Sequence, residues 1–147
     1  MASYAENRKA RFDYEILEKY VAGIELLGTE VKSVRAGQMS LEGAFVIIRG
    51  GEAFIINANI PAYQVKNAPK EYDRLRNRKL MLTKKEIAEL AGSEKNRSLT
   101  IIPISVYNKG RKIKVDIALV KGKKKADKRQ SIKKRDTERE LRREFKG

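Results

Sequence analysis

The feature that most constrains this chain is a long alternation of apolar and charged residues that stops at a helical turn. From Phe12 to Leu26 the even positions are apolar, with Glu18 as the exception. The odd positions of the same stretch include four charged residues, Asp13, Glu15, Lys19 and Glu25. Because successive side chains of a strand point to opposite faces, this period of two predicts a strand with one buried and one exposed face.

A short helix is expected directly after this strand. Thr29 can cap its N-terminus, and Glu30 lies in its first turn, where a negative charge suits the helix dipole. Lys32 and Arg35 follow toward the C-terminus, which favours cations, and Gly37 can adopt the left-handed conformation that ends a helix. The pattern therefore predicts a strand that leads into a basic helix.

Turn residues predict two hairpins further along the chain. Residues 44–49 and 52–60 are β-rich runs separated by a Gly-Gly pair, and such a turn needs the positive φ that glycine adopts freely. Residues 98–108 and 112–120 flank a second turn. Apolar and polar positions alternate in residues 112–120, which predicts one buried and one exposed face. Pro103 predicts an edge or a bulge in the first of these two strands.

One more helix and the strand lengths together indicate the fold class. Thr83 and Glu86 form a T-x-x-E capping box, which predicts a helix that runs until Gly92. Short strands joined by turns favour a mainly β fold, an antiparallel sheet closed into a small OB-like barrel of about six strands. A chain of 147 residues with 41% apolar residues can bury one core, so we expect one folded domain over residues 1–120.

Composition narrows the classes of function. The chain has 34 Lys and Arg against 19 Asp and Glu, a net charge of +15, which favours a polyanionic partner. It has no Cys and no His, which removes disulfides, thiolate zinc sites and the commonest general base. No apolar run approaches about 18 residues and no signal core is present, so a soluble cytoplasmic binder without metal or cofactor is expected.

Two groups of cations are candidate phosphate contacts. Arg74, Arg76 and Arg78 recur at every second position, which would align them on one face of an extended segment. Such a row can also be a merely solvated face. The basic N-terminal residues 8–11 could contact phosphate or form a frayed arm.

The aromatics of residues 63–72 could stack on bases or cover the sheet edge.

The composition changes at Lys121. Residues 121–147 carry 13 Lys and Arg against 5 Asp and Glu, so about half of the net charge lies in this tail. Its only large apolar residues are Ile132, Leu141 and Phe145, which are too few to bury a core, so the free tail is expected to be disordered. Pairs of opposite charge four residues apart predict a nascent helix that a partner would order.

Several strings of the sequence are similar to one family. They are NRKARFDY, AGI followed by GTEVKSVRAG, RNRKLML and GKKKADKR. Together they resemble the SsrA-binding proteins (SmpB), the partners of transfer-messenger RNA in bacterial ribosome rescue. The resemblance implies a small antiparallel β-barrel with three peripheral helices. It also implies a tail that enters the decoding region of the small ribosomal subunit and becomes helical in the empty messenger channel.

The resemblance and the charge patterns together give two sets of site residues. The expected RNA-binding residues are Arg8, Lys9, Arg11, Val21, Gly23, Glu30, Lys32, Arg35, Arg74, Arg76, Arg78, Lys79, Met81 and Thr83. The expected ribosome-binding tail residues are Gly122, Lys123, Lys124, Ala126, Asp127, Lys128, Arg129, Lys133, Lys134 and Arg135.

Of the departures from the family pattern, two bear on the expected function. Val21 stands where relatives usually carry Glu, on the outward face of the first long strand. Ala126 stands where relatives carry an aromatic ring or His that can stack in the decoding centre.

The resemblance implies that the chain binds the tRNA-like domain of transfer-messenger RNA, as a monomer and one to one, and delivers it to stalled ribosomes. A general single-strand RNA-binding protein or a ribosomal protein is the alternative. A magnesium-dependent nuclease using Asp13, Glu30 and Lys32 is a weaker one. That chemistry needs Glu30 and Lys32 on a strand, where they would point the same way, whereas a helix turns them about 200° apart.

Overall fold

The computed structural model of the chain describes residues 3–63 and 71–122. The elements in chain order are β1 (Ser3–Glu6), α1 (Ala10–Asp13), β2 (Tyr14–Ile24), α2 (Gly28–Arg35), β3 (Phe45–Arg49), β4 (Glu52–Ile56), β5 (Arg78–Met81), α3 (Lys84–Glu94), β6 (Leu99–Lys109) and β7 (Lys112–Gly122). Among these helices, none is long and apolar enough to cross a bilayer.

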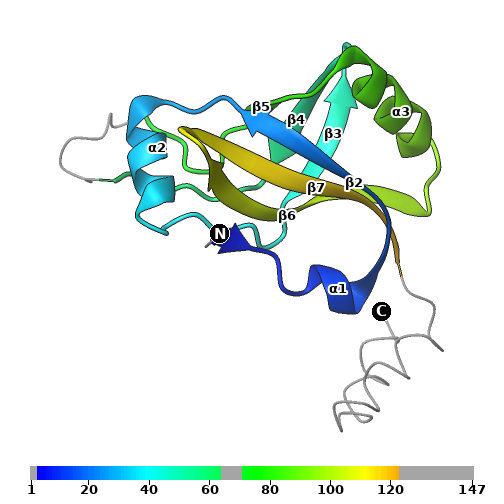
Figure 1. Cartoon of the computed structure of the whole chain (residues 1–147), viewed down its shortest axis with the longest axis horizontal. Coiled ribbons are helices and arrows are strands. Elements are labelled where there is room, and N and C mark those ends of the chain that lie inside the picture. The colour runs from blue at the N-terminus through cyan, green and yellow to red at the C-terminus, as the bar shows by residue number, and fades with distance from the viewer. Residues whose placement is uncertain (1–2, 64–70, 123–147) are drawn as a thin grey trace, which may run out of the picture.

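Six of the strands form a ring. Their order is β6-β3-β4-β5-β2-β7, and β7 pairs again with β6, so the pairing closes on itself. All pairings are antiparallel, and β1 joins β6 from outside the ring. The helices α2 and α3 lie at opposite ends of the sheet (Figure 1). The expected mainly β antiparallel fold is confirmed.

The strand β2 is shorter and less regular than its alternation predicts. It begins at Tyr14, because the preceding residues form the single turn of α1. The register shifts within it, since Ile16 pairs with Val120 whereas Glu18 pairs with Leu119, which leaves Leu17 as the extra residue of a bulge. Nothing in the sequence signals this bulge, because Leu17 itself is apolar.

The bulge turns the side chains of β2 from one face to the other. Tyr14 and Ile16 pack on a small cluster that includes Ala118 and Val120. Beyond the bulge, Tyr20 and the buried residues Ala22 and Ile24 pack on the main core inside the ring. The apolar even positions therefore serve two separate cores and not one.

The helix ends agree only in part with their sequence signals. α2 begins at Gly28, and Leu27 takes the N-cap position that was expected at Thr29, because the Glu30 carboxylate accepts a hydrogen bond from the Leu27 backbone N–H at 2.8 Å. Gly37 has the expected positive φ of 77°. α3 has the expected cap, but it runs through Gly92 to Glu94.

The turn signals are confirmed. Gly50 and Gly51 have φ values of 59° and 75°, as the turn between β3 and β4 requires. The register of β6 shifts after Pro103, which is the expected bulge. β7 extends through Gly122, which pairs with Tyr14, so two residues assigned to the tail continue the sheet.

The cap of α3 supports the first prediction. The Thr83 hydroxyl accepts from the Glu86 N–H at 3.2 Å, and the Glu86 carboxylate accepts from the Thr83 N–H at 2.9 Å. We expect Thr83→Ala to lower the free energy of unfolding by about 1 kcal/mol, measured by urea denaturation. Thr29→Ala is the matched control, because Thr29 lies inside α2 and caps nothing. An equal loss in both variants would contradict this role for Thr83.

Candidate nucleic-acid interface

The outer face of β5, β2 and β7 brings together several of the predicted RNA-binding residues. Gly23 of β2 pairs with Met81 of β5 on one side and with Lys114 of β7 on the other. Val21 lies two residues before Gly23 and therefore shares its face. Val21 and Met81 are 47% and 51% exposed, so both offer apolar surface on this face.

A hollow of about 340 Å³ opens on this face, and we call it the β2 hollow. Its lining residues are Gly23, Ile24, Leu26, Val31, Arg35, Met81, Arg111, Lys112, Ile113 and Lys114. Ile24 and Ile113 belong to the main core, and Leu26 and Val31 pack against it, so these four form the floor of the hollow. We call the four cations of the lining its rim. An apolar floor with a cationic rim suits a nucleobase or sugar flanked by phosphates.

Gly23 gives the floor of the hollow its shape. A Cβ atom at this position would lie 2.9 Å from Met81 Cε and 3.4 Å from Met81 Cβ, so any larger residue would displace the Met81 side chain. Gly23 is thus needed here for close packing and not for a positive φ. The resemblance named Gly23 and Met81 separately, and the structure places them in contact distance.

Three cations of the rim were not among the predicted site residues. Arg111, Lys112 and Lys114 come from the turn between β6 and β7 and from the start of β7. The Arg35 guanidinium donates to the Arg111 backbone carbonyl at 3.0 Å, which ties α2 to this turn. The alternation of β7 predicts exposed cations, but only its pairing with β2 places them beside Gly23.

Glu30 lies behind this face and is buried, with 1% of its surface exposed. Its Oε2 accepts hydrogen bonds from Arg76 Nε at 3.0 Å and from Arg78 Nε and Nη2 at 3.0 and 2.5 Å. Its Oε1 accepts from Arg76 Nη2 and from the Leu27 N–H. The Tyr72 hydroxyl lies 2.9 Å from Oε2. We call Glu30, Tyr72, Arg76 and Arg78 the Glu30 cluster.

The Glu30 cluster corrects the predicted cationic row. Residues 74 and 75 form a turn, residues 76 and 77 belong to no strand, and only Arg78 of the three arginines belongs to β5. Arg78 is fully buried and Glu30 nearly so, so neither side chain is available to an RNA on the surface. Arg76 is 32% exposed, and Arg74 is exposed with its Nε bonded to Asn59 Oδ1 at 2.7 Å. The period of two does bring Arg76 and Arg78 to one side, but that side faces the buried Glu30 carboxylate, whereas Arg74 bonds to Asn59 on the surface.

The protonation of Glu30 supports a second prediction. Burial by itself raises the pKa of Glu30, but the hydrogen bonds from Arg76, the Leu27 N–H and Arg78 outweigh it and lower the pKa from 4.5 to about 2. Because the pKa is lower in the folded protein, the ionised Glu30 carboxylate stabilises the fold. This stabilisation is complete above pH 4.5 and is lost as the pH falls toward 2. We expect the free energy of unfolding to fall by up to about 3 kcal/mol over this range.

Urea denaturation at a series of pH values measures this loss. Other carboxylates also titrate in the same range, so the Glu30 contribution is the difference between the wild-type protein and Glu30→Gln. The variant should show a clearly flatter dependence below pH 4.5. Equal slopes in the two proteins would contradict the prediction.

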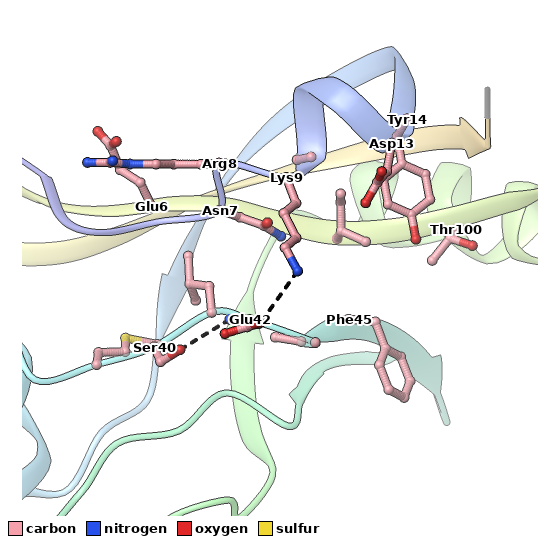
Figure 2. A pocket seen from close by; sticks show the side chains of 16 residues that line it. Glu6, Asn7, Arg8, Lys9, Asp13, Tyr14, Ser40, Glu42, Phe45 and Thr100 are labelled. Carbon is pink, nitrogen blue, oxygen red and sulfur yellow. Dashed lines mark hydrogen bonds and ion pairs between the residues drawn. The ribbon is translucent and has the colours of Figure 1, made fainter. Parts of the chain in front are cut away.

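The N-terminal cations lie in a different place. Arg8 and Lys9 line a groove of about 760 Å³ between the α1 region and the segment before β3, which we call the N-terminal groove. Figure 2 shows Lys9 pointing across it to Glu42, with 3.6 Å between Lys9 Nζ and Glu42 Oε1. Both side chains are largely exposed, so this ion pair contributes little to stability. Tyr14 and Thr100 line the same groove.

The other predicted RNA-binding residues are not part of the lining of the β2 hollow. Lys32 is exposed on α2 and Thr83 is the exposed cap of α3. Lys79 lies on the outer face of β5 and pairs with Glu52 at 2.5 Å. Arg11 belongs to α1, and its side chain is not among those that the structure describes. The tail residues 123–135 also lie outside the described residues.

The nuclease alternative finds no support in this geometry. Glu30 and Lys32 lie on a helix, and both carboxylate oxygens of Glu30 are occupied by arginine and backbone donors. Within residues 3–63 and 71–122, no group of three or more acidic, His or Cys residues could hold a metal ion.

Comparison with known proteins identifies the family. The sequence profile of the SmpB protein family matches residues 4–147. The SsrA-binding protein of Thermosynechococcus vestitus is 47% identical over 142 residues, which cover 97% of this chain and 93% of that protein. The SsrA-binding protein of a Sulfurihydrogenibium species is 51% identical over 144 residues, with 97% and 93% covered.

A solved structure is similar as well. A chain of the structure described as "tmRNA-SmpB: a journey to the center of the bacterial ribosome" has a TM-score of 0.68 and 45% identity. The match covers 81% of this chain and 83% of that chain. Because the family profile and the relatives each match almost the whole length, this chain belongs to the SmpB protein family.

Proposed function

We propose that this chain binds the tRNA-like domain of transfer-messenger RNA and delivers it to stalled ribosomes for trans-translation. The observation that carries the proposal is the β2 hollow. Residues that the family resemblance assigned to RNA converge there with cations that it did not assign. The names of the relatives, SsrA-binding proteins, and the tmRNA-SmpB description of the similar structure support the same RNA.

The proposed RNA contacts are the predicted residues that are not buried, together with the rim of the hollow. They are Arg8, Lys9, Arg11, Val21, Gly23, Lys32, Arg35, Arg74, Arg76, Lys79, Met81, Thr83, Arg111, Lys112 and Lys114. The cations would neutralise phosphates, while Met81 and Val21 offer apolar contact to bases or sugars. In this proposal the chain is a monomeric cytoplasmic binder, one to one with RNA, and not an enzyme. Peptide-bond chemistry then belongs to the ribosome.

The architecture proposed for this role has two parts. The ring of six strands is a closed OB-like barrel with three peripheral helices, and it holds the RNA. The tail, residues 121–147 in the sequence division, would enter the messenger channel of the ribosome, and from residue 123 on it lies outside the residues that the structure describes. The tail carries about half of the net positive charge of the chain, which supports a polyanionic partner.

Competition binding tests the proposed RNA. The tRNA-like domain of transfer-messenger RNA competes against bulk tRNA and poly-U at matched, near-physiological salt, because low salt makes any basic protein bind every RNA. We expect a clear preference for the tRNA-like domain. Equal binding to all three RNAs would instead support a general single-strand RNA-binding protein.

Val21 supports a third prediction. A Glu at this exposed position could accept hydrogen bonds from base edges or sugar hydroxyls that Val leaves unpaired. We expect Val21→Glu to tighten binding to the tRNA-like domain roughly five- to a hundred-fold, measured at fixed ionic strength. General electrostatics predicts the opposite sign, because the change adds a negative charge.

Two features of the structure sharpen this test. Val21 pairs directly with Asp116, so the new carboxylate would meet a like charge, which costs about 0.2–1 kcal/mol of stability. The control Lys19→Glu lies on the same face of β2 and pairs with Ala118. Weaker binding by Val21→Glu would mean either that the site has been rebuilt around an apolar contact or that the RNA-binding face lies elsewhere on the sheet.

A further inference from the structure

One buried carboxylate organises the exposed arginines of the segment that precedes β5. Glu30 belongs to α2, and its partners Tyr72, Arg76 and Arg78 follow 42, 46 and 48 residues later. The cluster therefore fastens two distant segments to each other. No sequence signal at Glu30 points to these partners, since its position also suits the helix dipole alone.

Glu30 holds Arg76 at two points. Arg76 Nε and Nη2 donate to the two carboxylate oxygens, which is the fork geometry of a bidentate arginine-carboxylate pair. Arg76 Nη1 makes only a long contact of 3.5 Å to the Asn77 carbonyl. One edge of this guanidinium is thus fixed inside the protein, while the side chain stays 32% exposed.

Arg78 fixes the backbone beneath the second exposed arginine. Its Nη1 donates to the Ala58 carbonyl at 2.7 Å and to the Arg74 carbonyl at 3.1 Å. The Ile60 N–H donates to the same Arg74 carbonyl at 3.0 Å. Because Asn59 also holds the Arg74 side chain, both ends of this residue are positioned.

We propose that Glu30 is a positioning residue for RNA binding, which holds Arg76 directly and Arg74 through Arg78 as a preformed pair of phosphate contacts. This inference rests on the proposed function. A free arginine loses much rotamer freedom when it binds phosphate, and a guanidinium already fixed by a carboxylate loses less. Glu71, Asp73 and Glu30 together balance the three arginines of residues 71–78, so the placement of the guanidinium groups, and not a net charge of this segment, carries the proposal.

The sign of one substitution separates positioning from charge. Glu30→Gln removes a negative charge from an RNA-binding protein, so electrostatics alone predicts tighter binding. Positioning predicts weaker binding to the tRNA-like domain, by roughly ten-fold, because two arginine side chains must then be ordered by the RNA. The salt dependence should also become shallower if a phosphate contact is lost.

Glu89→Gln is the matched control. Glu89 is an exposed carboxylate of α3 that accepts from the Tyr20 hydroxyl at 3.2 Å, so this change also removes one charge and one tyrosine partner. It has no arginine partner among the described residues. We expect its binding to be unchanged or slightly tighter.

A second variant covers the case in which Glu30→Gln does not fold. Glu30→Asp keeps the charge but is one methylene shorter, so it cannot hold both Arg76 and Arg78. It should weaken binding although the net charge is unchanged, and thermal melting confirms that each variant is folded at the binding temperature.

A double-mutant cycle with Arg76→Ala completes the test. If Glu30 acts through Arg76, the loss of affinity from Arg76→Ala should largely disappear in the Glu30→Gln or Glu30→Asp background. Wild-type affinity in the Glu30 variants, or additive losses, would overturn the inference. A wild-type protein without preference for the tRNA-like domain would instead count against the proposed function.

Discussion

A chain that ends at Gly122 is expected to stay folded, to keep most of its affinity for the tRNA-like domain and to lose ribosome rescue altogether. The described fold supplies the reason for this end point. β7 pairs with β2 up to Gly122 and with β6 up to Lys121. Every residue of the β2 hollow comes earlier in the chain than these two. All six strands of the ring lie within the residues that this chain keeps.

The measurements are melting temperature, competition binding and an assay of rescue on stalled ribosomes. A chain that ends at Val120 is the control, because it also removes the pairing of Gly122 with Tyr14 and of Lys121 with Leu99, and it should melt at a lower temperature. Removing the basic tail should weaken binding to bulk tRNA more than binding to the tRNA-like domain. Unfolding of the longer truncation, or full rescue by it, would contradict this division of roles.

The parts of the fold that the sequence predicted are those that depend on neighbouring residues. The Gly50-Gly51 turn, the Thr83 cap and the Pro103 bulge each follow from local chemistry that only those residue types provide. The bulge at Leu17 has no such signal. The start of α2 was misplaced because its cap is a backbone N–H held by a side chain three residues later.

The site was harder to predict, because its parts meet only through long-range pairing. Gly23 and Met81 are 58 positions apart in sequence and become partners when β2 pairs with β5. Arg76 and Arg78 were expected on the surface, because nothing in the sequence near them reveals that their carboxylate partner, Glu30, lies on the distant helix α2. Charge spacing predicts where cations can align, but it does not reveal which of them a distant acid will neutralise.

Arg78→Met is expected to destabilise the fold more than the loss of the Thr83 cap or the protonation of Glu30. Arg78 is fully buried, and it satisfies Glu30, the Tyr72 hydroxyl and the Ala58 and Arg74 carbonyls. Without Arg78 the buried Glu30 carboxylate keeps Arg76 and the Leu27 N–H but loses its other arginine, and the Ala58 carbonyl loses the Arg78 donor. Breaking a buried ion pair in this way costs about 3–5 kcal/mol. Urea denaturation at pH 7 measures the loss.

Arg49→Met is the matched control for this prediction. Arg49 pairs with Glu94 at 2.8 Å, but its side chain is 64% exposed, so water replaces the lost partner. The expected loss is at most about 1 kcal/mol. Similar losses in the two arginine variants would contradict a special role for the buried one.

The double variant Glu30→Leu with Arg78→Met shows where the energy resides. A buried ion pair replaced by apolar residues of similar size is often as stable as the original, because desolvation opposes the attraction between the charges. Arg76 can then turn into water, and Tyr72 keeps its 2.6 Å hydrogen bond to the Ile60 carbonyl. We therefore expect the double variant to be more stable than Arg78→Met alone. Equal losses would assign the stability to the carbonyl contacts of Arg78 and would contradict a penalty for leaving Glu30 without this arginine.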